Sequence, residues 1–280
     1  MPGSTGGPRL LVGSNPHFPD GPAERLHGNV SEVVRIGDTV RRSTGRWTPA
    51  VHALLRHLEA CGFGAAPHVR GIDAEGREVL SYIEGEVQHE PGPWITESIL
   101  RGVGVLLREL HEATRGFALP DGVAWAHRSP RGTRRATAVI CHNDVAPRNL
   151  IVRDGRPAAF LDWDFASPAS PLWDVAHACW EFVPLADDAR CERIGWSPLP
   201  ARPERARVLA DGYGLRAAER RRLPGVIVRR MAATADGMEF LAAGGDRAMQ
   251  RLVDRGFPAQ IRREIAWVEA NRDALAAALA

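Results

Sequence analysis

The sequence predicts an α+β protein with two lobes, a small β-rich N-terminal lobe and a larger, mostly helical C-terminal lobe. Short apolar runs separated by turn residues dominate as far as residue 84, a pattern typical of the strands of a small sheet. From Ile95 onward the apolar residues recur at helical spacing. One strand-like segment, residues 149–164, interrupts these helices. The length of 280 residues accommodates two modest domains.

The chain is expected to have three parts. Residues 1–22 are crowded with Gly and Pro and predict a loose arm. Residues 23–84 form the β-rich lobe, which we expect to bind a nucleotide, and residues 85–280 form the helical lobe with the catalytic loop and the substrate site. A ligand-binding cleft is expected between two such lobes.

Within the β-rich lobe, residues 31–42 predict a β-hairpin, because two runs of strand-forming residues flank a Gly-Asp turn. Thr48 and Pro49 then supply an N-cap and a first-turn proline for a helix that ends at Gly62. Residues 69–83 contain two further strand-like runs, separated by an Asp-Ala-Glu-Gly turn.

The composition argues against several classes of protein. With 44% hydrophobic and 25% charged residues, the chain is an ordinary folded protein. Its net charge of +2 gives no support for a nucleic-acid or anionic-membrane partner. No apolar stretch is long enough to span a membrane. The first residues lack a secretory signal, so a cytoplasmic location is expected, and nothing signals an obligate protein partner.

Two residue types have chemical consequences. All 36 basic residues are arginines, because the chain has no lysine, so any role usually given to lysine must be filled by arginine or left empty. The four cysteines stand far apart without a Cys-x-x-Cys pair, which predicts neither a zinc site nor a disulfide framework. We expect them to be reduced packing residues.

The segment from Cys141 to Asp164 carries the most specific signal. It reads His-x-Asp-x4-Asn, from His142 to Asn149, followed by Asp162 after a hairpin. Phosphoryl transfer needs a carboxylate near the attacking hydroxyl and oxygen ligands for Mg²⁺. Asp144 suits the first role. Asn149 and Asp162 suit the second, because an antiparallel hairpin brings its two ends together. Taken one at a time, each of these residues is better explained as a cap of a turn, and the combined pattern is what indicates a site.

This segment resembles the aminoglycoside phosphotransferase family, which has a two-lobed, protein-kinase-like fold, and the resemblance covers roughly residues 25–280. The resemblance rests on residues 142–149, 161–164, 171–176 and 106–111. The resemblance implies that Asp144 is the catalytic carboxylate and that Asn149 and Asp162 hold Mg²⁺. It also implies that His142 and Asp174 brace the catalytic loop.

Two departures from protein kinases favour a small-molecule substrate. Kinases regulated by activation-loop phosphorylation have His-Arg-Asp in the catalytic loop, whereas this chain has Asn143 in place of the arginine. The Ala-Pro-Glu segment of protein kinases does not follow Asp162. We therefore expect a small-molecule kinase without a phosphorylation switch.

For ATP or GTP, the best candidate loop is residues 28–31, whose backbone could cover phosphates, although an ordinary turn explains it equally well. Strand parity with Val40 places Arg42 where kinases have lysine. The following helix has Val51, His52 and Ala53 where the pairing glutamate is expected, so the usual ion pair is absent or rebuilt. Residues 81–85 resemble the family hinge that binds adenine. The expected nucleotide contacts are Gly28, Asn29, Ser31, Arg42, Ser81 and Ile83.

The second substrate is the least determined feature. Family members commonly bind polycationic antibiotics through clustered carboxylates of the helical lobe, and most such residues here are equally consistent with solvated charges. The candidates are Glu181, Asp187, Asp188, Glu239 and Glu269.

The leading hypothesis is an ATP- or GTP-dependent, Mg²⁺-requiring kinase of a hydroxyl on a small cationic antibiotic, such as an aminoglycoside or a basic cyclic peptide of the tuberactinomycin type. Such an enzyme would confer resistance. One alternative is a kinase of a small metabolite such as choline, a sugar or an amino alcohol, because one fold hosts many substrates. Another is a nucleotide-binding scaffold without catalytic activity. The absence of the lysine and glutamate that form the usual kinase ion pair favours this alternative.

Overall fold

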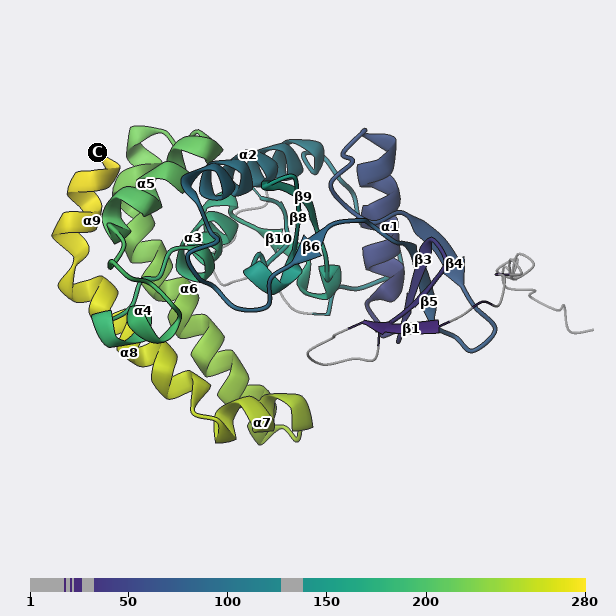
Figure 1. Cartoon of the computed structure of the whole chain (residues 1–280). Coiled ribbons are helices and arrows are strands. Elements are labelled where there is room, and N and C mark those ends of the chain that lie inside the picture. The colour runs from purple at the N-terminus through teal and green to yellow at the C-terminus, as the bar shows by residue number, and fades with distance from the viewer. Residues whose placement is uncertain (1–17, 19–20, 22, 27–32, 127–137) are drawn as a thin grey trace, which may run out of the picture. The chain divides into compact units, whose positions relative to one another are not determined.

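The computed structural model divides into two compact units (Figure 1), residues 1–45 with 69–82 and residues 46–68 with 83–280. The described residues are 18, 21, 23–26, 33–126 and 138–280. Most of the expected arm, residues 1–22, lies outside them. The lobe boundary expected after residue 84 stays a prediction.

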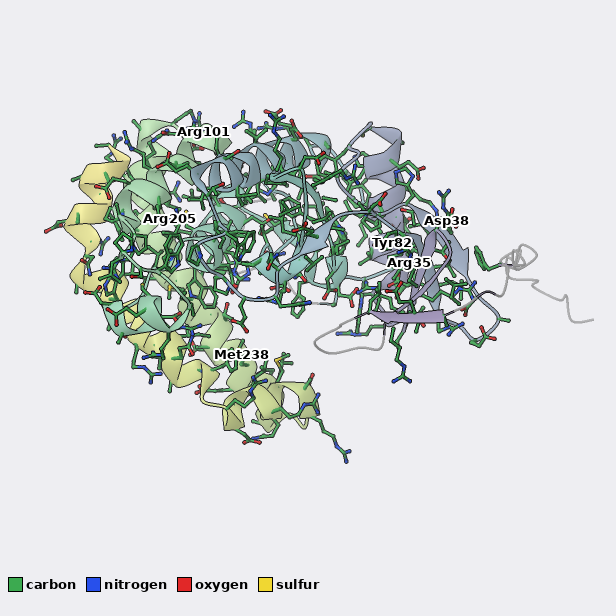
Figure 2. The ribbon with its side chains drawn as sticks, viewed as in Figure 1. Arg35, Asp38, Tyr82, Arg101, Arg205 and Met238 are labelled. Carbon is green, nitrogen blue, oxygen red and sulfur yellow. The ribbon has the colours of Figure 1, made fainter. Side chains whose placement is uncertain are left out.

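The first unit contains a five-stranded antiparallel sheet in the order β1-β2-β3-β5-β4 (Figure 1). The strands are β1 (Ala23–Leu26), β2 (Val33–Ile36), β3 (Thr39–Arg42), β4 (Val69–Ile72) and β5 (Glu78–Ser81). The expected β2–β3 hairpin is confirmed, and Gly37 has the positive φ of 61° that its turn needs. On one face of this sheet, the Arg35 guanidinium lies 3.8 Å from the centroid of the Tyr82 ring (Figure 2).

The second unit is mostly helical. Its first helix, α1 (Thr48–Ala60), carries Pro49 in its first turn, as expected, but its N-cap is Trp47 rather than Thr48. The other helices are α2 (Glu97–Ala113), α3 (Pro171–Phe182), α4 (Asp188–Arg193), α5 (Arg202–Tyr213), α6 (Ala217–Ala243), α7 (Arg247–Asp254), α8 (Phe257–Ala270) and α9 (Arg272–Leu279). None of the helices in the described part is long and apolar enough to cross a membrane.

Helices α2 and α5 pack with their backbones in direct contact. A Cβ atom on Gly104 of α2 would lie 2.4 Å from the carbonyl oxygen of Leu209, and one on Gly212 of α5 would lie 2.2 Å from that of Arg101. Only glycine allows this approach. The close pair fixes α2, whose residue His111 contacts Asp174, a residue predicted to brace the catalytic loop.

Two small sheets position that loop. The first has the order β6-β8-β9, and the second pairs β7 with β10. Their strands are β6 (Glu86–Val87), β7 (Val139–Cys141), β8 (Leu150–Arg153), β9 (Arg156–Phe160) and β10 (Ser167–Ala169). The predicted β8–β9 hairpin is confirmed, and both of its turn residues, Asp154 and Gly155, have positive φ. The sequence did not indicate β6, β7 or β10, because two or three residues are too few to display a strand period.

Candidate active site

The loop predicted to be catalytic, residues 142–149, is called the catalytic loop below. It begins where β7 ends and returns into β8 through a short 3-10 turn, Pro147–Asn149. Its second residue, Asn143, has a left-handed backbone with φ of 63°. The Asn143 amide group donates to the carbonyl oxygen of Phe165 at 3.0 Å and to the hydroxyl of Ser167 at 3.0 Å. Asn143 therefore ties the loop to the segment that follows Asp162.

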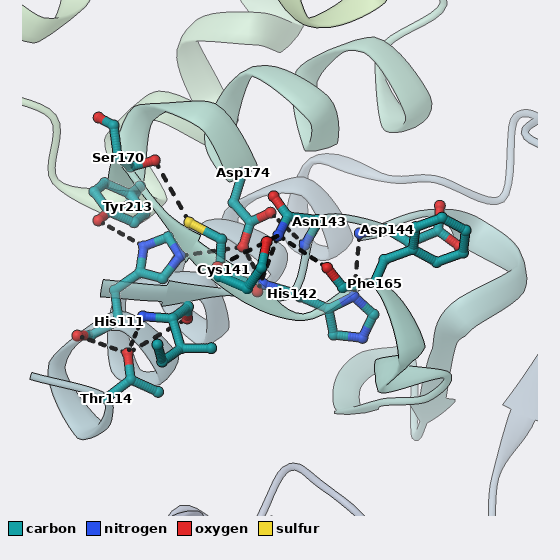
Figure 3. Close-up of polar contacts among 12 residues, drawn as sticks. His111, Thr114, Cys141, His142, Asn143, Asp144, Phe165, Ser170, Asp174 and Tyr213 are labelled. Atoms are coloured by element: carbon teal, nitrogen blue, oxygen red, sulfur yellow. Dashed lines mark hydrogen bonds and ion pairs between the residues drawn. The ribbon is translucent and has the colours of Figure 1, made fainter. Parts of the chain in front are cut away.

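Asp174, from the first turn of α3, braces the start of this loop (Figure 3). Its carboxylate accepts hydrogen bonds from the backbone N–H of His142 at 2.7 Å and of Asn143 at 2.8 Å. It also lies 3.2 Å from Nε2 of His111, whose Nδ1 is 2.9 Å from the Tyr213 hydroxyl. Burial alone would raise the pKa of Asp174, but these hydrogen bonds and the neighbouring histidines lower it below its ordinary value.

His142 connects the catalytic loop to the end of the hairpin. Its Nδ1 accepts from the backbone N–H of Asp144 at 3.3 Å, so the proton is on Nε2, which donates to the carbonyl oxygen of Leu161 at 2.9 Å. Burial lowers the pKa of His142 and keeps the imidazole neutral. The ring packs against Trp163, with centroids 4.6 Å apart.

The hairpin brings Asn149 and Asp162 to the same end. The backbone N–H of Leu161 donates to the carbonyl oxygen of Asn149 at 2.8 Å, directly beyond the last register pair of β8 and β9. Asp162 follows with φ of 60°, a left-handed conformation that Asp tolerates better than most residues. The site residues expected from the motif, His142, Asp144, Asn149 and Asp162, thus lie on one loop and one hairpin end.

Asp144 is surrounded by donors. Its Oδ2 accepts from Nδ2 of Asn149 at 2.7 Å, and its Oδ1 accepts from Nη2 of Arg148 at 2.6 Å. Nε2 of His177, on α3, lies 3.5 Å from the same Oδ1. Burial by itself would raise the pKa of Asp144, but the Arg148 charge and His177 lower it well below its ordinary range. Asp144 is therefore ionised at neutral pH.

The donor chemistry of Asn149 and Asp162 fits Mg²⁺. Both hydrogens of the Asn149 amide are used, toward the backbone oxygen of Asp144 at 2.9 Å and its Oδ2 at 2.7 Å. Oδ1 then remains as a ligand atom, and none of the described residues donates to it. An amide oxygen and a carboxylate are the hard ligands that Mg²⁺ prefers.

In the first unit, Arg42 forms a buried ion pair with Glu78, its register partner on β5, with Nε and Oε1 2.5 Å apart. Arg41 lies on the opposite face, where its register partner is Val79. Ser81 ends β5 and is half-buried, as is Ile83. The predicted nucleotide-loop residues Gly28, Asn29 and Ser31 lie outside the described residues.

Of the five acidic residues expected to bind substrate, Glu181 is the one that the structure brings to the catalytic loop, through an ion pair with Arg148 at 3.2 Å. Asp187 caps the N-terminus of α4, and Asp188 pairs with Arg202 at 2.7 Å. The other two are on helices, where Glu239 pairs with Arg262 and Glu269 is exposed on α8.

Three residues at the site were not assigned a role from the sequence. Arg148 and His177 contact Asp144. Arg230 of α6 donates from Nη2 to the carbonyl oxygen of Asn143 at 2.7 Å, and its guanidinium carbon lies 5.5 Å from the centroid of the Trp173 ring. The spacing of four residues between Asp144 and Arg148 was the one available signal. The other two contacts depend on how α3 and α6 pack.

A family model described as the phosphotransferase enzyme family matches residues 122–222. The chain is also 42% identical, over 190 residues, to the trifolitoxin immunity protein of Rhizobium leguminosarum bv. trifolii. That match covers 67% of this chain and 72% of the relative. The chain belongs to the phosphotransferase enzyme family, and the family expected from its motifs is confirmed. Membership of this family makes it a phosphotransferase.

Solved structures of low sequence identity share its fold. A choline/ethanolamine kinase family protein from Mesorhizobium loti superposes with a TM-score of 0.56 at 20% identity, covering 89% of this chain and 92% of that one. The GDP complex of aminoglycoside 2'-phosphotransferase-IIIa gives a TM-score of 0.55 at 12% identity, covering 90% and 94%. The expected α+β, kinase-like fold is confirmed.

Proposed function

We propose that the protein is an ATP- or GTP-dependent O-phosphotransferase that modifies a hydroxyl of a small cationic antibiotic and so confers resistance. The observation that carries this proposal is the ionised Asp144 carboxylate, hydrogen-bonded to Asn149 in a loop that leads to Asp162. The relative that gives immunity to trifolitoxin and the aminoglycoside phosphotransferase fold support the antibiotic branch. A cytoplasmic location, without a nucleic-acid or membrane partner, belongs to the same proposal.

In this reaction, Asp144 orients the acceptor hydroxyl and accepts its proton. Oδ1 of Asn149 and the carboxylate of Asp162 would hold Mg²⁺, which neutralises charge on the nucleotide phosphates when bound. His142 connects the backbone N–H of Asp144 to the carbonyl oxygen of Leu161 through its two ring nitrogens. Asp174 holds the first two loop residues from α3. The loop is thus fixed before any substrate arrives.

One observation favours the second candidate, a kinase of a small metabolite such as choline, a sugar or an amino alcohol. Of the acidic residues expected to bind a polycation, Glu181, Asp188 and Glu239 are each paired with an arginine. Pairing reduces the negative charge that a polycation would meet. A substrate with one positive charge or none is therefore compatible with this site.

The test combines growth and binding. Cells expressing the chain are challenged with a panel of antibiotics, and the purified protein is screened by thermal shift against antibiotics and metabolites with Mg²⁺ and a non-hydrolysable nucleotide. A ligand at one hundred times its dissociation constant adds about 2.7 kcal/mol of stability. We expect an antibiotic among the stabilising ligands, and Asp162→Ala to lose the Mg²⁺-nucleotide shift. Stabilisation by metabolites alone would select the second candidate.

A further inference from the structure

Arg148 bridges two carboxylates at the base of the proposed phosphoryl-transfer site. Its Nη2 lies 2.6 Å from Oδ1 of Asp144, and its Nη1 lies 3.2 Å from Oε2 of Glu181 on α3. The side chain of Arg148 is 31% exposed, and those of Asp144 and Glu181 are 17% and 18% exposed. The Arg148 side chain is therefore partly buried beside the proposed base and still accessible to solvent.

The Arg148 guanidinium keeps donors for a third partner. A guanidinium has five N–H donors and is always charged in proteins. Nη2 donates to Oδ1 of Asp144 and Nη1 donates to Oε2 of Glu181. The charge and the remaining N–H groups are therefore available beside the proposed base.

The Arg148 charge lies on the carboxylate that an acceptor hydroxyl would contact. An acceptor hydroxyl that donates to Asp144 comes next to the atom that Arg148 already contacts. Catalysis of phosphoryl transfer depends on cations that neutralise the equatorial oxygens of the transferred group. A guanidinium offers a planar fork of donors for such oxygens. No lysine exists in the chain to fill this role.

We propose that Arg148 is a catalytic residue that binds the transferred phosphoryl group, and that Glu181 is its positioning residue; this inference rests on the proposed function. The acceptor oxygen forms a bond to the terminal phosphorus, and its proton passes to Asp144. The bond between that phosphorus and the bridging oxygen breaks, and its electron pair leaves with the nucleoside diphosphate. Glu181 holds one edge of the guanidinium, and the N–H groups that Asp144 and Glu181 do not use donate to the phosphoryl oxygens.

The experiment measures calorimetric binding of Mg²⁺-ADP with and without aluminium fluoride, which mimics the phosphoryl group in flight and needs no acceptor. Transition-state analogues bind at least about 100-fold more tightly than ground-state ligands. In wild type, aluminium fluoride should tighten ADP binding by about that factor. Arg148→Ala should leave Mg²⁺-ADP affinity within about threefold and lose at least about tenfold of the tightening, as one lost charge-assisted contact predicts.

Further variants separate catalysis from folding. Arg148→Met retains the aliphatic stem and serves if Arg148→Ala does not fold. Glu181→Gln should lose part of the tightening and Glu181→Asp should regain some of it, without a change in Mg²⁺-ADP affinity. Arg220→Ala is the matched control, because Arg220 also pairs with a carboxylate, Asp211 at 2.7 Å, but between α5 and α6. It should retain the full tightening.

Full tightening in a folded Arg148→Met protein would overturn the inference and leave the proposed function intact. Absence of tightening in wild type that still binds Mg²⁺-ADP would also overturn it. A wild-type protein that binds neither Mg²⁺-ADP nor Mg²⁺-GDP would contradict the proposed function itself. The two failures are therefore distinguishable.

Discussion

Two residues of the site, Asn143 and Asp162, adopt left-handed backbones, with φ of 63° and 60°. This conformation costs an ordinary L-residue roughly 1–2 kcal/mol, and Asn and Asp are the non-glycine residues that visit it most readily. At Asn143 the surroundings enforce it, because Asp174 accepts from its N–H and Arg230 donates to its carbonyl oxygen. Such strain is found where a loop is held in one functional geometry.

The first prediction concerns Asp144, the proposed base. Asp144→Asn should lower turnover by about 100- to 10,000-fold, because the amide cannot accept the acceptor proton. Mg²⁺-nucleotide affinity should be spared, since Asn149 and Asp162 are unchanged. Initial rates of nucleotide consumption, with calorimetric nucleotide binding alongside, measure the two effects. Turnover at the wild-type rate would contradict the assignment.

The second prediction concerns Asp174 and pH. Its folded-state pKa is lowered, so the ionised carboxylate stabilises the fold above its unfolded pKa of about 4, and this contribution is lost as pH falls through the folded pKa. Asp174→Asn should therefore lower the free energy of unfolding at pH 7 by about 1–3 kcal/mol. The deficit should shrink below pH 4. Urea unfolding at pH 7 and pH 3 measures it, and a deficit that is equal at both pH values would exclude this origin.

Among the secondary-structure elements, strand β3 carries two arginines with opposite environments. Arg42 pairs with Glu78 across β3 and β5, whereas Arg41 is buried at 3% exposure beside Val79. The cross-strand pair gives Arg42 an acidic partner within the sheet. The sheet face on which Arg42 was expected to bind phosphate thus carries both an arginine, Arg42, and a carboxylate, Glu78.

The third prediction is that Arg42→Ala weakens nucleotide use by about 1.5–3 kcal/mol, the value of a charge-assisted phosphate contact. Arg41→Ala should have little effect on nucleotide affinity. Both variants should reduce stability, Arg42→Ala because Glu78 is left buried without its Arg42 partner. Arg42→Lys should restore affinity only in part, because an ammonium lacks the planar fork. Nucleotide dissociation constants and urea midpoints for the three variants provide the comparison. A larger affinity loss in Arg41→Ala would refute the strand-parity argument.

The fourth prediction tests the contact between α2 and α5. Gly212→Ala would force a methyl group to 2.2 Å from the Arg101 carbonyl oxygen, so it should destabilise the protein by at least about 2 kcal/mol. Gly237→Ala is the matched control on α6, where a Cβ would meet nothing within 4 Å. It should stabilise by about 0.5–1 kcal/mol, since alanine is the better helix former. Thermal unfolding distinguishes the two, and equal effects would contradict the close approach.

The elements that the sequence predicted best are those with local signals. A Gly-Asp turn predicted the β2–β3 hairpin, an Asp-Gly turn predicted the β8–β9 hairpin, and Pro49 marked the start of α1. The motif likewise predicted Asp144 and Asn149, because its spacing is local. For Arg148 the one signal was its spacing of four residues from Asp144, and His177 and Arg230 had none. The contacts of these last two residues depend on how α3 and α6 pack on the loop, and no short sequence pattern predicts the packing of distant segments.

For the whole molecule, the fifth prediction concerns its thiols. Cys141, Cys179 and Cys191 are buried, and Cys61 is exposed. Burial raises the pKa of Cys179 to about 12 and also raises the pKa values of Cys141 and Cys191, which suppresses their reactive thiolate forms. Ellman's reagent should therefore modify one thiol in the native protein and four after unfolding. Rapid native modification of Cys61→Ser would contradict this.

The packing of Trp163 gives the site an optical reporter of its own. The indole is buried, donates to the carbonyl oxygen of Phe160 at 3.0 Å and packs against the His142 ring. Trp163 directly follows Asp162 in the chain. Its fluorescence therefore originates beside the histidine that contacts the proposed base and one residue from the proposed metal ligand. The difference between wild type and Trp163→Phe isolates this emission from that of the other seven tryptophans. Occupancy of the site can then be followed in real time without a label or a coupled assay.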